Sequence, residues 1–232
     1  MSGAKYRHEI YAVRRAPADV LYIFIEGDGS PWIDDGRRPA RNPTASAPLA
    51  LELAAQTPHS VLYLGRPCYL HTNADPLCEP AVWTTGRYSI DVVRSMVSVA
   101  NRYAADGGFS HIVLIGYSGG GTLAVLMAPY VPATRAVITI AANLDVDAWS
   151  NWHHYLPLSD SLNPSTQPAL DMRIVQLHLI GGRDSNVPPD RSSRYLDTLS
   201  AQQVMRFDDF DHVCCWVAQW PDILAHVDEL LR

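Results

Sequence analysis

The chain has 232 residues, of which 47% are hydrophobic and 18% are charged, and its formal net charge is −6. This length and composition are typical of a globular protein, and we expect residues 1–232 to form a single domain. The acidic balance argues against nucleic-acid binding, and no apolar run approaches the roughly 18 residues that span a bilayer. The first residues lack the apolar stretch of a secretory signal, which leaves two locations open: the cytoplasm, or the periplasm or cell envelope if a signal was removed.

Strand-like and helix-like segments alternate along the chain. In chain order we expect a strand at 20–25, a helix at 46–56, strand 61–64, a helix from the N-cap Ser89 to about 107, strand 111–115, helix 122–128, strand 136–141, strand 174–180, strand 204–207 and helix 221–231. Residues 143–171 have no clear period, and we expect a short irregular segment over one end of the sheet. The alternation predicts an α/β fold with a mostly parallel central sheet and helices on both faces.

Four cysteines form two pairs in the sequence. Cys68 and Cys78 flank a short polar loop with little apolar content, which favours a disulfide over two free thiols. Cys214 and Cys215 are adjacent, and a bond between neighbouring cysteines closes a strained ring. We therefore expect Cys214 and Cys215 to be small core residues at the start of a helix.

Residues 116–120 read Gly-Tyr-Ser-Gly-Gly and match the pattern G-x-S-x-G. The match lies between a predicted strand and a predicted helix, where a nucleophile elbow belongs. Glycines at 116 and 120 remove side chains that would clash in so tight a turn. A phosphate-binding loop needs a different glycine spacing and a lysine, so the alternative is an ordinary glycine-rich turn. We interpret Ser118 as a nucleophile.

Two candidate partners for Ser118 follow it in the sequence. A serine hydroxyl needs a base to accept its proton and a carboxylate to orient that base. His212 follows strand 204–207 and is the candidate base, while Asp184 follows strand 174–180 and is the candidate acid. The chain order Ser, acid, His is the order expected with this elbow. Other acids near the predicted sheet edge or near His212 are alternatives: Asp145, Asp147, Asp208, Asp209 and Asp211.

The remaining parts of the predicted site are oxyanion donors and a substrate pocket. We expect the backbone N–H groups of Gly119 and Asp28 to form the oxyanion hole, Asp28 lying in a Glu-Gly-Asp-Gly loop after the first strand. Aromatic side chains could line the pocket or merely cover the sheet, and the candidates are Trp32, Tyr117, Trp149, Trp152 and Tyr155. Neighbouring residues such as His153 and His154 do not converge on one point, so we expect no metal and no cofactor.

These segments together resemble the α/β-hydrolase superfamily over nearly the full length of the chain. More narrowly, the chain is similar to a group of small bacterial α/β hydrolases that are often exported or lipid-anchored. The resemblance rests on EGDG with the following Trp32, LGRPC ending at Cys68, WTTGRYS from Trp83, GYSGGG, ANLDVDAW, SLNP from Ser161, GGRD and DHVCCW. It implies a serine-dependent mechanism and little or no cap domain. The EGDG loop differs from better-known lipases, which often have His-Gly there.

The sequence therefore predicts a serine hydrolase that cleaves an ester, a thioester or a related acyl bond through an acyl-enzyme. Because residues 143–171 are too few for the large lid of a lipase, a carboxylesterase acting on short-chain or soluble small molecules is favoured. Three alternatives stay open: an acyltransferase, a peptidase, and a catalytically silent binding protein of the same fold. The oligomeric state has no signal in the sequence.

Overall fold

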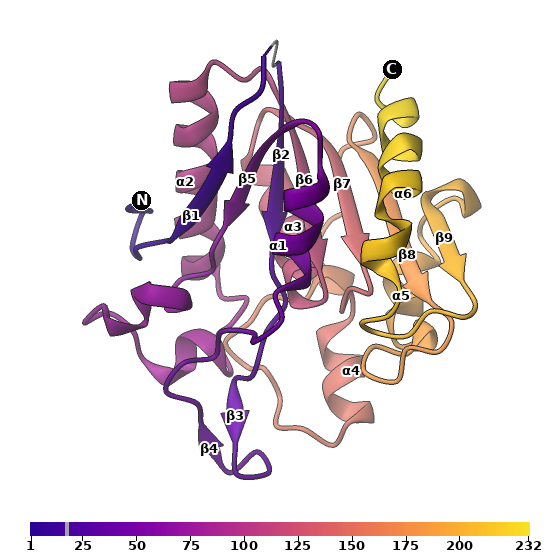
Figure 1. Cartoon of the computed structure of the whole chain (residues 1–232). Coiled ribbons are helices and arrows are strands. Elements are labelled where there is room, and N and C mark those ends of the chain that lie inside the picture. The colour runs from indigo at the N-terminus through magenta and orange to yellow at the C-terminus, as the bar shows by residue number, and fades with distance from the viewer. Residues whose placement is uncertain (17–18) are drawn as a thin grey trace.

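A seven-stranded sheet runs through the molecule in the order β1-β5-β2-β6-β7-β8-β9 in a computed structural model, which describes residues 1–16 and 19–232. β1 pairs antiparallel with β5, and the remaining neighbours in the sheet pair in parallel. The expected mostly parallel sheet is confirmed (Figure 1). Its strands are β1 (Ile10–Val13), β2 (Val20–Ile25), β5 (Ser60–Leu64), β6 (His111–Tyr117), β7 (Thr134–Ile140), β8 (Val175–Gly181) and β9 (Val204–Phe207).

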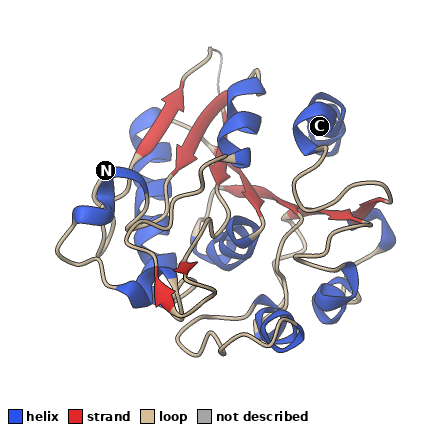
Figure 2. Cartoon of the chain, turned by 60° about the horizontal axis from the view of Figure 1, so that its bottom comes forward, coloured by secondary structure: helices blue, strands red, loops and turns tan. Residues whose placement is uncertain are grey.

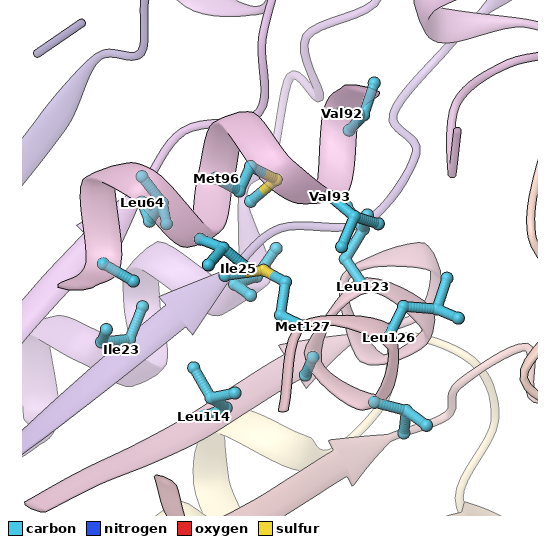
Figure 3. Packing of buried hydrophobic residues seen from close by; sticks show 14 of the residues in the cluster. Ile23, Ile25, Leu64, Val92, Val93, Met96, Leu114, Leu123, Leu126 and Met127 are labelled. Carbon is cyan, nitrogen blue, oxygen red and sulfur yellow. The ribbon is translucent and has the colours of Figure 1, made fainter. Parts of the chain in front are cut away.

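Helices cover both faces of this sheet, as Figure 2 shows. The side chains of β2 alternate: Leu21 and Ile23 join the core under α2 (Ile90–Gly107) and α3 (Gly119–Met127). Tyr22 and Phe24 join the opposite core, under α1 (Leu49–Gln56) and α6 (Trp216–Leu230). Figure 3 shows the first core, where Ile25 and Leu114 of the sheet face Met96, Leu123 and Met127 of the helices. Within the described ranges, the helices are too short or too polar to span a membrane.

The predicted boundaries hold best where local chemistry sets them. The Ser89 side chain accepts a hydrogen bond from the backbone of Val92, and Gly108 has a left-handed conformation after α2, so both ends of that helix are confirmed. α1 begins three residues later than expected, at Leu49. α6 begins at Trp216 rather than Pro221, because Trp216 is fully buried and its indole N–H donates to the backbone oxygen of Asp211.

Several elements are not predicted from the sequence. Residues 143–171 are not irregular throughout, because α4 (Val146–Trp152) begins there with Asp145 as its N-cap. β1 is a short edge strand, and the expected pattern does not include it or the small hairpin of β3 (Trp32–Ile33) and β4 (Arg38–Pro39). The remaining helical turns are α5 (Ser193–Leu196), η1 (Leu70–Ala74), η2 (Pro80–Trp83), η3 (Ala128–Tyr130), η4 (Pro164–Thr166), η5 (Pro189–Ser192) and η6 (Ala201–Gln203).

The two cysteine pairs behave differently from each other. Cys68 and Cys78 form a disulfide with their Cα atoms 5.5 Å apart, which confirms the predicted staple of this loop. Cys214 and Cys215 are also bonded to each other, and both are exposed, so their expected role as core residues is wrong. Trp216, directly after them, supplies the buried side chain at the start of α6 instead.

Glu26 ties the end of β2 to the start of α1. The N-cap of α1 is Pro48, whose side chain makes no capping hydrogen bond. Instead, the Glu26 carboxylate accepts the backbone N–H of Ala50 at 3.0 Å and the backbone N–H of Gly27 at 3.1 Å. Burial raises the pKa of Glu26 to about 7, although these hydrogen bonds to the charged form oppose the rise.

The replacement Glu26→Gln tests this burial. The carboxyl titrates near 4.5 when unfolded and near 7 when folded, so its contribution to stability is present below pH 4.5 and is lost as pH rises to 7. Glutamine does not titrate, so the unfolding free energy of the wild type should fall relative to the variant by up to about 3 kcal/mol across this window. Urea unfolding at a series of pH values measures the difference. The exposed Glu52→Gln is the control, and a pH-independent difference for Glu26→Gln would contradict the raised pKa.

Candidate active site

Ser118 occupies a sharp turn between β6 and α3. Its φ of 51° and ψ of −123° are unfavourable for a residue with a side chain, and its N–H donates to the carbonyl of Ile140 at 2.8 Å. The flanking glycines make the turn possible. A β-carbon on Gly116 would overlap the backbone of Gly120, and one on Gly120 would overlap the carbonyl oxygen of Ile25. The turn therefore has the geometry of a nucleophile elbow.

Three of the predicted site residues form one chain of hydrogen bonds. Nε2 of His212 lies 3.1 Å from Oγ of Ser118, and Nδ1 of His212 lies 2.8 Å from Oδ2 of Asp184. Oδ1 of Asp184 accepts the backbone N–H groups of Asn186 and Val187, at 2.8 and 2.7 Å. Asp184 is 4% exposed, so its orientation is set by buried contacts. The imidazole of His212 is thus within direct hydrogen-bond reach of both Oγ of Ser118 and the carboxylate of Asp184.

The alternative acids are engaged elsewhere. Asp145 accepts the N–H of Ala148 at the start of α4, and Asp147 accepts the side-chain amide of Asn163. Near His212, Asp208 pairs with Arg206, Asp209 pairs with Arg183, and Asp211 accepts the backbone N–H groups of Val213 and Cys214. Of the candidate acids, Asp184 makes the hydrogen bond to His212.

The two predicted oxyanion donors lie on either side of Ser118. Gly119 is the first residue of α3, where the backbone N–H groups and the helix dipole favour negative charge. A β-carbon on Gly27 would lie only 3.2 Å from Cβ of Ser118, so the loop that contains Asp28 runs directly beside the nucleophile. Within residues 1–16 and 19–232, the N–H groups of Gly119 and Asp28 donate to no other protein atom.

The side chain of Asp28 is the centre of a buried charge cluster. Its carboxylate accepts hydrogen bonds from the guanidinium groups of Arg66 and Arg87, the latter at 2.8 Å, and from the hydroxyl of Tyr88 at 2.6 Å. The Tyr69 hydroxyl donates to the Asp28 carbonyl at 3.0 Å. Burial alone would raise the pKa of Asp28, but the charges of Arg87 and Arg66 outweigh it and hold the pKa well below its usual range. The carboxylate is therefore ionised, and its position is fixed.

A cleft of about 850 Å³ opens over Ser118 and His212. Four of the five predicted aromatic residues line it, namely Trp32, Tyr117, Trp149 and Tyr155. Trp152 does not: it is 42% exposed and its ring packs edge-on against His153 at 4.5 Å. The prediction for Trp152 is wrong because Trp149 lies on the buried side of α4, whereas Trp152 lies on its exposed side.

Several polar residues around the cleft are not predicted from the sequence. Glu26, Arg87 and Asn143 line the cleft, and Arg66 lies behind it. Arg66 lies in the LGRPC segment and Arg87 in the WTTGRYS segment. The resemblance rests partly on these segments but assigns no role to either arginine. Among the residues that the structure describes, no group of three or more His, Cys, Asp or Glu side chains is arranged to hold a metal ion.

No protein-family model and no curated protein matches the sequence. Among solved structures, the chain is similar to a serine hydrolase without a lid from Xanthomonas campestris, with a TM-score of 0.60 and 15% identity over 97% of this chain and 89% of that one. A lipase-esterase related protein from Clostridium acetobutylicum matches with a TM-score of 0.64 and 11% identity over 96% of this chain and 98% of that one. A puromycin-hydrolyzing peptidase from Mycobacterium tuberculosis matches with a TM-score of 0.66 and 16% identity over 96% of this chain and 37% of that one. At these identities the likeness shows the fold alone, and the chain has the fold of the α/β hydrolases.

Proposed function

We propose that this protein is a serine hydrolase that cleaves an ester, a thioester or a related acyl bond through an acyl-enzyme. The observation that supports this most is the continuous hydrogen-bonded path from Asp184 through His212 to Ser118. A buried carboxylate that orients an imidazole, which in turn contacts a serine hydroxyl, is the arrangement that activates a serine for acyl transfer.

In the proposed reaction, Oγ of Ser118 attacks the carbonyl carbon of the substrate while Nε2 of His212 accepts the hydroxyl proton. The tetrahedral intermediate then collapses, the bond to the leaving group breaks, and His212 returns the proton to that group. A water molecule next attacks the acyl-enzyme with His212 as base, and the free acid leaves with Ser118 restored. Asp184 holds the imidazole tautomer and stabilises its positive charge throughout.

Two features support stabilisation of the oxyanion in this reaction. The N–H groups of Gly119 and Asp28 are the proposed donors, and neither is used within the described protein. Behind them, one carboxylate and two guanidinium groups give the Asp28 cluster a net positive charge, with Arg87 lining the cleft itself. Negative charge that develops on the substrate oxygen would meet these donors and this positive charge.

A short-chain or soluble ester fits the cleft best. The segment of residues 143–171 contains only the short helix α4, the helical turn η4 and loops, which is little material for a lid over a long acyl chain. The solved structures of similar fold include a serine hydrolase, a lipase-esterase related protein and a peptidase, which supports hydrolysis of an acyl bond in general. A carboxylesterase is the narrower activity that we propose.

The replacement Ser118→Ala tests the nucleophile. The wild type should form a covalent adduct with a fluorophosphonate probe and hydrolyse p-nitrophenyl esters, with the highest kcat/KM for short acyl chains. Ser118→Ala should form no adduct and lose about 10⁴-fold or more in kcat. Ser110→Ala, at the opposite end of β6, is the matched control. Equal activity of Ser118→Ala and wild type would disprove the assignment, and a wild type without adduct or turnover would favour a silent binding protein.

The acyl acceptor distinguishes a hydrolase from a transferase. Products formed from a short ester with and without an added alcohol or amine should be the free acid in both cases. A new ester or amide as the main product would indicate an acyltransferase instead. Cleavage of peptide p-nitroanilides with higher kcat/KM than esters would indicate a peptidase.

The replacement Tyr88→Phe tests whether the Asp28 cluster positions the oxyanion loop. It removes the 2.6 Å hydrogen bond to Asp28 and leaves the buried ring in place. We expect kcat for a p-nitrophenyl ester to fall about 10-fold with little change in KM, because the loop donor matters most in the transition state. The exposed Tyr130→Phe is the control. A lower Tm with unchanged kcat would restrict Tyr88 to a structural role.

A further inference from the structure

The chain turns sharply at the end of α4 and places Tyr155 at the cleft. His154 has a φ of 56°, and its N–H donates to the carbonyl of Asn151 at 3.2 Å. The N–H of Tyr155 donates to the carbonyl of Ser150 at 2.9 Å. These are the two hydrogen bonds of a Schellman motif, which ends a helix with one left-handed residue. The backbone at the end of α4 therefore sets the position of Tyr155.

An aromatic cluster holds the ring of Tyr155 in place relative to the candidate acid. The ring stacks on that of His153, with an interplanar angle of 5° and centroids 4.8 Å apart, and it contacts Trp149 at 5.4 Å. The carbonyl of Asn186 accepts the indole N–H of Trp149 at 2.8 Å, and Nε2 of His153 lies 2.7 Å from the same oxygen. Asn186 in turn donates its backbone N–H to Asp184. The cluster is thus tied to the loop that contains the candidate acid.

One face of the Tyr155 ring is open. His153 covers the other face, and the centroid of Trp149 lies 5.1 Å from His153 as well as 5.4 Å from Tyr155. The three centroids form a nearly equilateral triangle, so Trp149 does not lie over the face opposite to His153. No further ring among the described residues contacts Tyr155, and 56% of the residue is exposed. Tyr155 lines the same cleft as Ser118, so a bound substrate can reach this ring.

We infer that Tyr155 determines substrate specificity by stacking on an aromatic ring of the substrate, so that the enzyme prefers esters with such a ring in their acyl or alcohol part. This inference rests on the proposed function and deepens it. A ring on the open face extends the existing stack of His153 and Tyr155 with the offset geometry that aromatic pairs prefer. A saturated ring of similar size has no π-face and gains only from the burial of its apolar surface.

The neighbours of Tyr155 support an apolar ligand at this position. Trp149 contacts Tyr155 and lines the cleft with it, and Leu156, the next residue, is 71% exposed and lines the cleft as well. An apolar wall of this kind favours flat apolar groups over charged ones, which would lose hydration there. Because the stack already restrains the Tyr155 ring, little further freedom is lost when a ligand binds against it.

The test compares two pairs of esters whose members differ in the saturation of one ring. Ethyl phenylacetate and ethyl cyclohexylacetate carry the ring in the acyl part, and benzyl acetate and cyclohexylmethyl acetate carry it in the alcohol part. The measured quantity is the kcat/KM of the aromatic ester divided by that of its saturated partner, from titration of the released acid. Comparison of this ratio between proteins cancels the intrinsic reactivity of the esters. Tyr155→Leu should lower the ratio about 2- to 10-fold in at least one pair, and the pair that responds shows which part of the substrate meets Tyr155.

Two control variants separate stacking from other effects. Tyr155→Phe keeps the ring, so its ratio should equal that of the wild type. Tyr130→Leu replaces a tyrosine of similar exposure that lines a different groove, and it should also leave the ratio unchanged. An unchanged ratio for both pairs in Tyr155→Leu would overturn the inference, whether or not kcat/KM itself falls. An equal fall in Tyr155→Phe would also overturn it, because the hydroxyl and not the ring would then be responsible.

Binding to Ser118→Ala separates this inference from the proposed function. The measured quantity is the Kd of the saturated ester divided by that of the aromatic ester, from NMR titration. This quotient should be higher for Ser118→Ala than for Ser118→Ala with Tyr155→Leu in at least one pair. If the wild type forms no fluorophosphonate adduct yet the quotient changes as described, the hydrolase proposal fails and ring stacking stands. If the adduct forms but neither ratio responds to Tyr155→Leu, ring stacking fails and the hydrolase proposal stands.

Discussion

The ion pairs between Asp28 and two buried arginines hold three separate segments of the chain against the elbow. Arg66 follows β5, and Arg87 precedes α2, yet both guanidinium groups meet the carboxylate of Asp28 after β2. A β-carbon on Gly119 would overlap the Asp28 carboxylate, so the cluster also packs against the start of α3. Loss of the Asp28 carboxylate would leave two buried guanidinium charges uncompensated, at a cost of about 3–5 kcal/mol. These contacts tie the loop beside Ser118 to three other segments of the chain.

The parallel sheet explains how distant segments of the chain form one site. Parallel strands end at the same edge, so the loops after β2, β6, β7, β8 and β9 lie next to one another. Asp184 follows β8 and His212 follows β9, and these strands are neighbours. The loops can then bring His212 and Asp184 within hydrogen-bond distance of each other, and His212 within reach of Ser118. Ligand sites of open α/β sheets lie at this edge for the same reason.

Buried polar groups divide into two kinds around the cleft. Glu26 and the Asp28 cluster have all their main partners within the protein, and they maintain the shape of the loop and of α1. The N–H groups of Asp28 and Gly119 and the side chain of Asn143 have none within the described residues. Native proteins rarely leave buried polar groups unpaired, and Asp28 and Asn143 are among the residues that line the cleft containing Ser118.

The sequence by itself determined the fold class, the elbow and the positions of Asp184 and His212 in the chain, because hydrophobic period, glycine spacing and chain order are local properties. It also determined the Cys68–Cys78 bridge and both ends of α2. Only the tertiary structure decided which acid meets His212, that Trp152 turns outward, and that α6 begins at Trp216. The Asp28 cluster and the unpaired amide of Asn143 belong to the same group. Each of these depends on contacts between residues far apart in the chain, which propensity and spacing do not encode.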